Sequence, residues 1–284
     1  MNKNKTIFII ALVFMLLCLP AYADDFSDNE EDTKAVSSVS DQWKFTLIPY
    51  FWLPSADADA TVAGVTQSVK LTFGDIIDNF DLFGLSGRFE AWKGKWGLIL
   101  DLMYTDLDGH FENSDPIAKM NPLLNELNVE IAQANVDFAL SYHLCTLALR
   151  EGYDSPALSI NLIGGGRYVY LKQEVTPTIR STLTPKLGKS KDWVEPFIGA
   201  QVLLQLTEKL HCGVRGDFGG FGVGSASTKT WNFAGAIGYR FSERYAIRLG
   251  YHIYDIDYSN GSGTDGFGLD GKLDGPKLGI MYHF

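Results

Sequence analysis

The sequence predicts an all-β fold: a transmembrane antiparallel up-and-down β-barrel of about ten strands, with eight or twelve strands as alternatives. Three observations lead to this prediction. The chain begins with an export signal, it has no later run of 18 apolar residues, and it contains repeated segments of about ten residues that alternate between apolar and polar side chains. A chain that enters a membrane without an apolar helix must cross it as a closed barrel, and about ten residues is the length of a tilted spanning strand.

The amino terminus has the three parts of a secretory signal. Lys3 and Lys5 precede the apolar stretch Ile7–Leu19, and the small-residue site Ala21-Tyr22-Ala23 follows it. This order predicts a cleaved signal peptide over residues 1–23. Six acidic residues then fall within Asp24–Lys34, which predicts a solvated periplasmic leader over residues 24–41 and a barrel over residues 42–284.

Ten segments have the alternation expected of spanning strands. In chain order they are Trp43–Pro54, Leu82–Trp92, Trp96–Leu107, Ile131–Tyr142, Leu158–Leu171, Trp193–Leu206, Leu210–Phe221, Trp231–Phe241, Tyr245–Tyr254 and Lys277–Phe284.

The two faces of these segments differ in composition. One parity carries large apolar side chains such as Leu98, Leu100 and Leu102, and the other is rich in Gly, Ala, Ser and Asn. A soluble sandwich or barrel tends to carry long Lys and Glu side chains on its polar face, whereas small polar residues suit a crowded interior. The pattern therefore favours an apolar face toward lipid and a polar lumen.

Short and long connections alternate along the chain. An even-stranded barrel with short turns on the periplasmic side has both ends in the periplasm. The stretches Gly74–Asp81 and Pro116–Asn128 have apolar spacing compatible with helices. The long connections expected at the outer end are Ser55–Asp81, Asp108–Glu130, Lys172–Asp192 and Asp255–Pro276.

Aromatic residues fall near both ends of the predicted strands, as expected of side chains at the two membrane interfaces. At the periplasmic ends they are Trp43, Trp96, Tyr142, Tyr239, Phe241, Tyr245 and Phe284. At the outer ends they are Phe51, Trp52, Tyr104, Trp193, Trp231 and Tyr254.

Charged residues of both signs recur on the inward parity. A barrel of about eight strands has an interior just filled by side chains, and charges in so confined a space persist when they are paired. We expect a salt-bridged lumen; the alternative is a narrow pathway that selects small polar solutes. The predicted lumen charge network consists of Arg88, Glu90, Asp101, Asp137, Arg167, Glu195, Arg215, Asp217, Arg240 and Arg248.

Other classes of site have little support in the sequence. The formal net charge of −10 disfavours nucleic acid as a partner. Cys145 and Cys212 are expected to remain free thiols, with a single disulfide as the alternative. The acidic segment from Asp255 to Asp270 fails the EF-hand pattern because Asn260 stands where Gly is required, so a solvated loop is expected and no metal or cofactor is predicted.

The sequence also contains residues that could form a catalytic group. Asp108, His110 and Ser114 have the residue types of orienter, base and nucleophile near the outer end of one strand, where an enzyme acting on outer-leaflet lipid would need them. Proximity within a polar turn is weak geometry. We therefore expect no catalytic residues.

The last strand alternates apolar residues and ends the chain on an aromatic ring. Leu278, Ile280, Tyr282 and Phe284 resemble the carboxy-terminal signal that the barrel assembly machinery recognises. Together with Trp43–Pro54 (WKFTLIPYFWLP), Gly84–Leu107 and Gly164–Leu171 (GGGRYVYL), this strand resembles a family of poorly characterised proteobacterial outer-membrane β-barrel proteins.

The resemblance implies a location in the cell outer membrane of a Gram-negative envelope, contact with its lipid and lipopolysaccharide, and assembly by that machinery. It supplies no catalytic or binding residues. The function expected from the sequence is a non-enzymatic structural or interaction role. The alternatives are a narrow, porin-like channel for small solutes and a lipid A-modifying enzyme.

Overall fold

The structure, a computed structural model, is a closed antiparallel β-barrel. It describes residues 41–62, 64–112, 124–149, 156–179, 182–183, 187–224 and 227–284. The predicted signal peptide and almost all of the predicted leader lie outside these residues and stay predictions.

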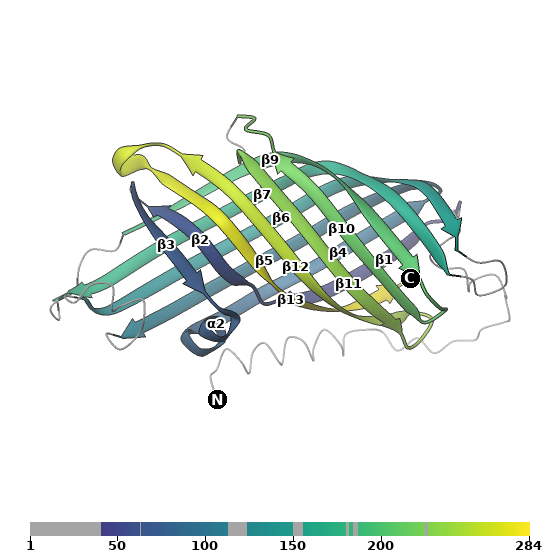
Figure 1. The fold of residues 1–284 in the computed structure, drawn as a ribbon, viewed down its shortest axis with the longest axis horizontal. Coiled ribbons are helices and arrows are strands. Elements are labelled where there is room, and N and C mark those ends of the chain that lie inside the picture. Colours follow the sequence, from purple (N-terminus) through teal and green to yellow (C-terminus); the bar gives the residue numbers. More distant parts are fainter. Residues whose placement is uncertain are drawn as a thin grey trace.

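Ten strands form the wall, and each is antiparallel to its neighbours (Figure 1). The last strand pairs with the first, with Thr46 opposite His283 and Trp52 opposite Lys277, so the barrel closes. The prediction of ten strands is confirmed. In order around the wall they are β1 (Lys44–Trp52), β4 (Phe80–Lys93), β5 (Trp96–Glu112), β6 (Leu124–Ala148), β7 (Ala157–Ile179), β9 (Leu187–Gln205), β10 (Leu210–Gly220), β11 (Lys229–Arg240), β12 (Tyr245–Asn260) and β13 (Phe267–His283).

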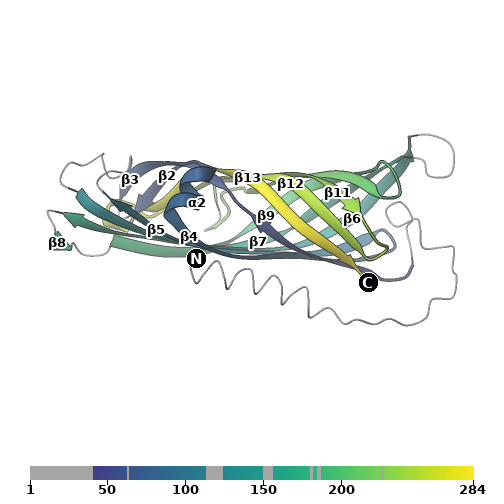
Figure 2. The ribbon, with the colours of Figure 1, turned by 90° about the horizontal axis from the view of Figure 1, so that it is seen from below.

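The two ends of the barrel differ. At one end lie the beginning of β1, the end of β13 and the tight links after β4, β9 and β11; we call it the short-turn end. The opposite end, called the extended end, carries the prolonged parts of β6, β7 and β9 (Figures 1 and 2). Both ends of the wall thus lie on the same side, as an even number of strands requires.

Several strands are longer than the alternation predicted. β6 has 25 residues and β7 has 23, about twice the length that spans a membrane. The segment Leu124–Asn128, expected within a helix, is strand, and residues 116–123 of that expected helix lie outside the described residues. The expected loop Asp255–Pro276 is also mostly strand, interrupted near its middle by the 3-10 turn η2 (Gly263–Asp265).

The extra length is hydrogen-bonded wall that carries charged pairs rather than an apolar outer face. Lys172 lies 2.6 Å from Glu174 and 3.4 Å from Glu130, and the ammonium of Lys272 lies 3.0 Å from Asp274. Such partly exposed pairs are compatible with water and not with lipid. The extended half therefore projects beyond the membrane.

The expected loop Ser55–Asp81 is an ordered unit instead. It contains strands β2 (Ser55–Val62) and β3 (Val65–Leu71), followed by the helix α2 (Phe73–Asn79). β2 pairs with the outer part of β13, where β1 has already ended, so this hairpin prolongs the wall. α2 matches the helix expected near Gly74–Asp81 and packs beside β3, β4 and β5. A short strand of two residues, β8 (Thr182–Leu183), pairs with the end of β7.

The faces of the wall follow the predicted parity. Leu98, Phe138, Ile198, Ile237 and Leu249 are exposed apolar side chains on five different strands, and the charged residues between them point inward. Because unpaired apolar surface of this extent is stable only against lipid, these side chains mark the membrane-facing band.

Three of the expected interface aromatics face the lumen instead. Trp52, Trp193 and Tyr254 are buried, whereas Trp231, expected at the same interface, is 53 % exposed. The cause is the alternation of side chains along a strand. Trp193 lies on the same, inward side of β9 as Glu195, because an aromatic residue near a strand end can point to either face. The placement of these three residues at the interface was wrong.

The two cysteines of the barrel are free and half-buried, on β6 and β10. Within the described part of the chain, no helix is both long and apolar enough to span a membrane.

Candidate functional site

Strand register sets five charged residues in one row across neighbouring strands. Arg88 on β4 lies opposite Asp101 on β5, which lies opposite Asp137 on β6. Asp137 in turn lies opposite Arg167 on β7, and Arg167 opposite Glu195 on β9. Side chains directly opposite each other on one face of a sheet are in contact, so the row is a continuous belt of charges inside the barrel.

Arg167 is the centre of this belt and is 1 % exposed. Its guanidinium donates two hydrogen bonds to Asp137, at 2.7 and 3.1 Å, and a third at 2.8 Å to Asp217. Glu195, which has no exposed surface, lies 3.5 Å away. A planar guanidinium that binds three carboxylates meets the condition under which a buried charge is stable, namely saturation with partners.

Arg215 on β10 pairs with Asp217 of its own strand and reaches across the lumen to Asp101 and Asp137. It lies 3.1 Å from Asp137, 3.0 Å from Asp217 and 3.9 Å from Asp101. Asp101 and Asp137 are like charges on facing positions, an arrangement that is unfavourable by itself. Arg215 lies between them and compensates for their repulsion.

The belt continues to the closing seam of the barrel. The Nε of Arg88 is 2.6 Å from Glu90, and its Nη1 is 3.5 Å from Asp101. Asp101 also accepts a hydrogen bond of 2.8 Å from the hydroxyl of Tyr50 on β1, and the ammonium of Lys277 on β13 lies 3.3 Å from the centroid of the Tyr50 ring. This last contact is a cation–π interaction.

The remaining two strands contribute on the other side of Asp217. Asn232 on β11 donates to Asp217 at 3.2 Å, and its side-chain oxygen contacts the ring of His252 on β12. That imidazole packs on Trp52 with ring centroids 4.5 Å apart. All ten wall strands thus supply at least one side chain to a connected layer, which we call the lumen layer: Tyr50, Arg88, Glu90, Asp101, Asp137, Arg167, Glu195, Arg215, Asp217, Asn232, His252 and Lys277.

Toward the extended end the interior becomes apolar. Trp193 stacks on Tyr258 with ring centroids 3.7 Å apart and planes 7° from parallel, and its Nε1 donates to Glu195 and to Ser227. We call this packed interior the aromatic cluster; its buried members are Trp52, Ala58, Met103, Val169, Leu171, Trp193, Tyr254, Ile256, Tyr258, Phe267 and Leu269.

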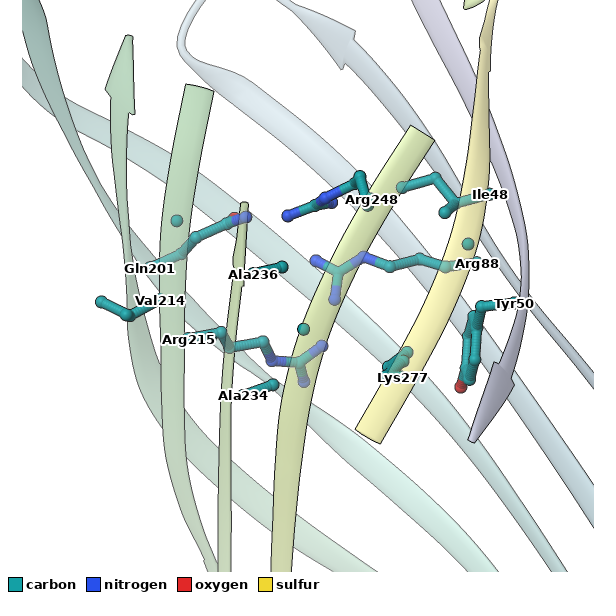
Figure 3. Close-up of a pocket in the computed structure, with 14 residues that line it drawn as sticks. Ile48, Tyr50, Arg88, Gln201, Val214, Arg215, Ala234, Ala236, Arg248 and Lys277 are labelled. Atoms are coloured by element: carbon teal, nitrogen blue, oxygen red, sulfur yellow. The ribbon is translucent and has the colours of Figure 1, made fainter. Parts of the chain in front are cut away.

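Toward the short-turn end the layer borders a cavity of about 80 Å³, which we call the cationic chamber (Figure 3). Arg88, Arg215, Arg248 and Lys277 line it, and none of its lining residues is acidic. Figure 3 shows the three guanidinium groups entering the same space from different strands. The room for it comes from small inward residues on neighbouring strands: Gly213, Ala234, Ala236, Gly250 and Gly279.

The structure brings together eight of the ten residues that were expected to form the charge network. Arg240 and Arg248 differ, because neither has a carboxylate within 4.0 Å among the described residues. Sequence reasoning missed Tyr50 and Lys277. Parity could have found both, since Lys277 adjoins the lipid-facing Leu278 and must point inward.

The catalytic alternative stays a prediction. Asp108 and His110 lie two apart in β5, with their backbones opposite Glu130 and Asn128 of β6, and Ser114 lies outside the described residues. Asp255 and Asp257 belong to β12 rather than to a loop. No group of three or more His, Cys, Asp or Glu in the described ranges is placed to hold a metal ion.

Comparisons with known proteins return bacterial outer-membrane barrels. The outer membrane protease OmpT from Escherichia coli is 10 % identical with a TM-score of 0.48, covering 89 % of this chain and all of its own. The translocator domain of the autotransporter NalP from Neisseria meningitidis is 10 % identical with a TM-score of 0.35, covering 85 % of this chain and 88 % of its own. Ail, the attachment invasion locus protein of Yersinia pestis, is 11 % identical with a TM-score of 0.29, covering 85 % and 98 %. No protein-family model and no curated protein matches the chain.

The location follows from the barrel itself. A closed wall of ten antiparallel strands carries an apolar band on its outer face, and that band encircles a polar, charged lumen. This is the construction of transmembrane barrels of the bacterial outer membrane. The chain is a β-barrel protein of the cell outer membrane.

Proposed function

We propose that this protein is a non-enzymatic outer-membrane barrel with a closed lumen, which acts as a structural or interaction-mediating component of the envelope. The observation that carries the proposal is the lumen layer. Every wall strand contributes to it, and Arg167 at its centre is almost fully buried by carboxylates from three other strands. A solute would have to separate these ion pairs to pass.

The aromatic cluster supports the same conclusion independently. It packs apolar side chains from the wall strands and the β2–β3 hairpin directly beyond the layer, on the side of the extended end. Water and ions are excluded from such a packed apolar interior. The lumen is therefore closed at two successive levels, by the ion pairs of the lumen layer and by the apolar packing of the aromatic cluster.

The extended half is the part that meets partners in this proposal. Its outer surface carries charged pairs such as Lys229 and Asp255, 3.8 Å apart, in place of an apolar band. The membrane half contacts outer-membrane lipid and lipopolysaccharide. In biogenesis, the barrel assembly machinery would read the last strand, where Leu278 faces outward and Phe284 stacks on Phe45 across the closing seam.

Planar-bilayer recording tests the proposal. The full chain is expressed, extracted from membranes in detergent, shown to be folded by its heat-modifiable migration in gels, and inserted into a bilayer beside a general porin as a positive control. We expect no discrete conductance steps from this protein. Steps that change in size in the Arg88→Ala variant would overturn the proposal and favour the narrow channel instead.

A further inference from the structure

The lining of the cationic chamber contains four cations and no carboxylate. Of its four cations, Arg88 and Arg215 have carboxylates within 4.0 Å, whereas Arg248 and Lys277 have none among the described residues. The ammonium of Lys277 lies over the face of the Tyr50 ring, 3.3 Å from its centroid. Arg248 and Lys277 are half-buried cations without a close carboxylate in the described ranges, and an anion bound beside them would be stabilised by both charges.

Unused hydrogen-bonding groups line the same space. The Nη2 of Arg88 and the side-chain oxygen of Gln201 are buried without a hydrogen-bond partner in the described structure. The orientation of a side-chain amide is an assignment, and rotating the amide of Gln201 by half a turn presents its NH₂ group at that position instead. The chamber then offers only donors.

We propose that the cationic chamber is a binding site for a small inorganic oxyanion of the phosphate or sulfate type. Arg88 and Arg248 supply guanidinium donors, Lys277 supplies an ammonium, and Gln201 supplies its amide. Several guanidinium groups around one point favour an anion with several oxygens over a monatomic one, because each planar fork can bind two oxygens. A cavity of about 80 Å³ has room for such an ion and excludes nucleotides and sugar phosphates.

The ligand has one route of entry. The lumen layer and the aromatic cluster close the interior toward the extended end, so access is from the short-turn end. His211, Arg240 and His283 lie at that end of their strands and are half-buried.

Thermal unfolding in detergent tests the site. The membrane-extracted full chain is titrated with sodium phosphate or sodium chloride at matched ionic strength, and tryptophan fluorescence reports the midpoint. We expect phosphate to raise the midpoint saturably by about 5 °C relative to chloride. Isothermal titration calorimetry with phosphate gives the affinity directly. Absence of a saturable phosphate effect in both measurements would overturn the proposal.

Three variants localise the effect. Arg248→Gln and Lys277→Gln each remove a charge and should weaken phosphate binding at least tenfold while leaving stability in chloride unchanged or higher, because like charges are relieved. Ala236→Leu fills the chamber without changing its charge and should abolish binding. Lys70→Gln is the matched control: it removes one charge from an exposed lysine of β3 and should titrate like the wild type.

If Arg248→Gln and Ala236→Leu both respond to phosphate as the wild type does, any bound anion lies elsewhere. That result would contradict the proposal. Titration with glycerol 3-phosphate, which has the phosphate ester of a lipid headgroup, distinguishes a site for free phosphate from a site for a headgroup. It should bind at least tenfold more weakly than phosphate, and equal binding would contradict the size argument. None of these results depends on whether the barrel conducts, so this proposal and the closed-lumen proposal can fail separately.

Discussion

Replacing Arg167 with methionine should destabilise the barrel by about 3–5 kcal/mol, the cost of breaking a buried ion pair by removing one partner. The structure explains why the cost is large and why it is not the sum of four contacts. Asp137 and Asp217 keep Arg215 as a partner after the change, at 3.1 and 3.0 Å. Glu195 keeps its hydrogen bonds from Trp193 and Thr230 but loses its only ion pair among the described residues.

The measurement is equilibrium unfolding by urea in lipid vesicles, followed by tryptophan fluorescence. Lys70→Met is the control, because the Lys70–Asp57 pair is similarly close, at 2.9 Å, but both side chains are mostly exposed, at 78 % and 62 %. An exposed pair contributes about 0–1 kcal/mol. The two variants thus remove the same charge from opposite environments.

A loss below about 1 kcal/mol for Arg167→Met would refute the reasoning, since it would mean that water reaches the lumen layer. If the variant fails to insert, Arg167→Lys provides the second test. Lysine keeps the charge but cannot form the bidentate hydrogen bond with Asp137. This variant should therefore fold, with an intermediate loss of stability.

Three further predictions concern other parts of the molecule. In α2, Asp75 accepts hydrogen bonds from the backbone and hydroxyl of Thr72, which lower the pKa of its carboxyl group. Because this pKa is lower in the folded state, the stabilisation is present at neutral pH and is lost as the pH falls below about 4; amide exchange in α2 should therefore accelerate there, and Asp75→Asn should remove the dependence. Brominated lipid should quench Trp231 and leave the buried Trp193 unaffected in single-tryptophan variants; equal quenching would contradict the lumen placement. Phe284→Ala should slow folding into vesicles several-fold, because this ring stacks on rings of both strands at the closing seam; an unchanged rate would exclude the ring from the closing step.

Much of the fold could be read from local pattern. A period of two identifies a strand and its two faces, so alternation placed Leu98 and Ile237 toward lipid and Arg167 and Glu195 inside. The ends of the strands were harder to predict. Beyond the membrane both faces of the wall can be polar, so the alternation that marks a strand is lost. For that reason the outer halves of β6, β7 and β13, and the β2–β3 hairpin, were expected to be loops.

The sequence by itself determined that the chain forms a barrel of about ten strands with charges inside, because hydrophobic alternation and export signals are local properties of the chain. Which charges meet was decided by the tertiary structure. Register sets Asp137 opposite Arg167, and closure brings Arg215 on β10 across the lumen to Asp101 on β5. The same closure leaves Arg248 and Lys277 without a carboxylate within 4.0 Å in the described part of the chain. Pairing depends on distances across the barrel, which no spacing along one strand encodes.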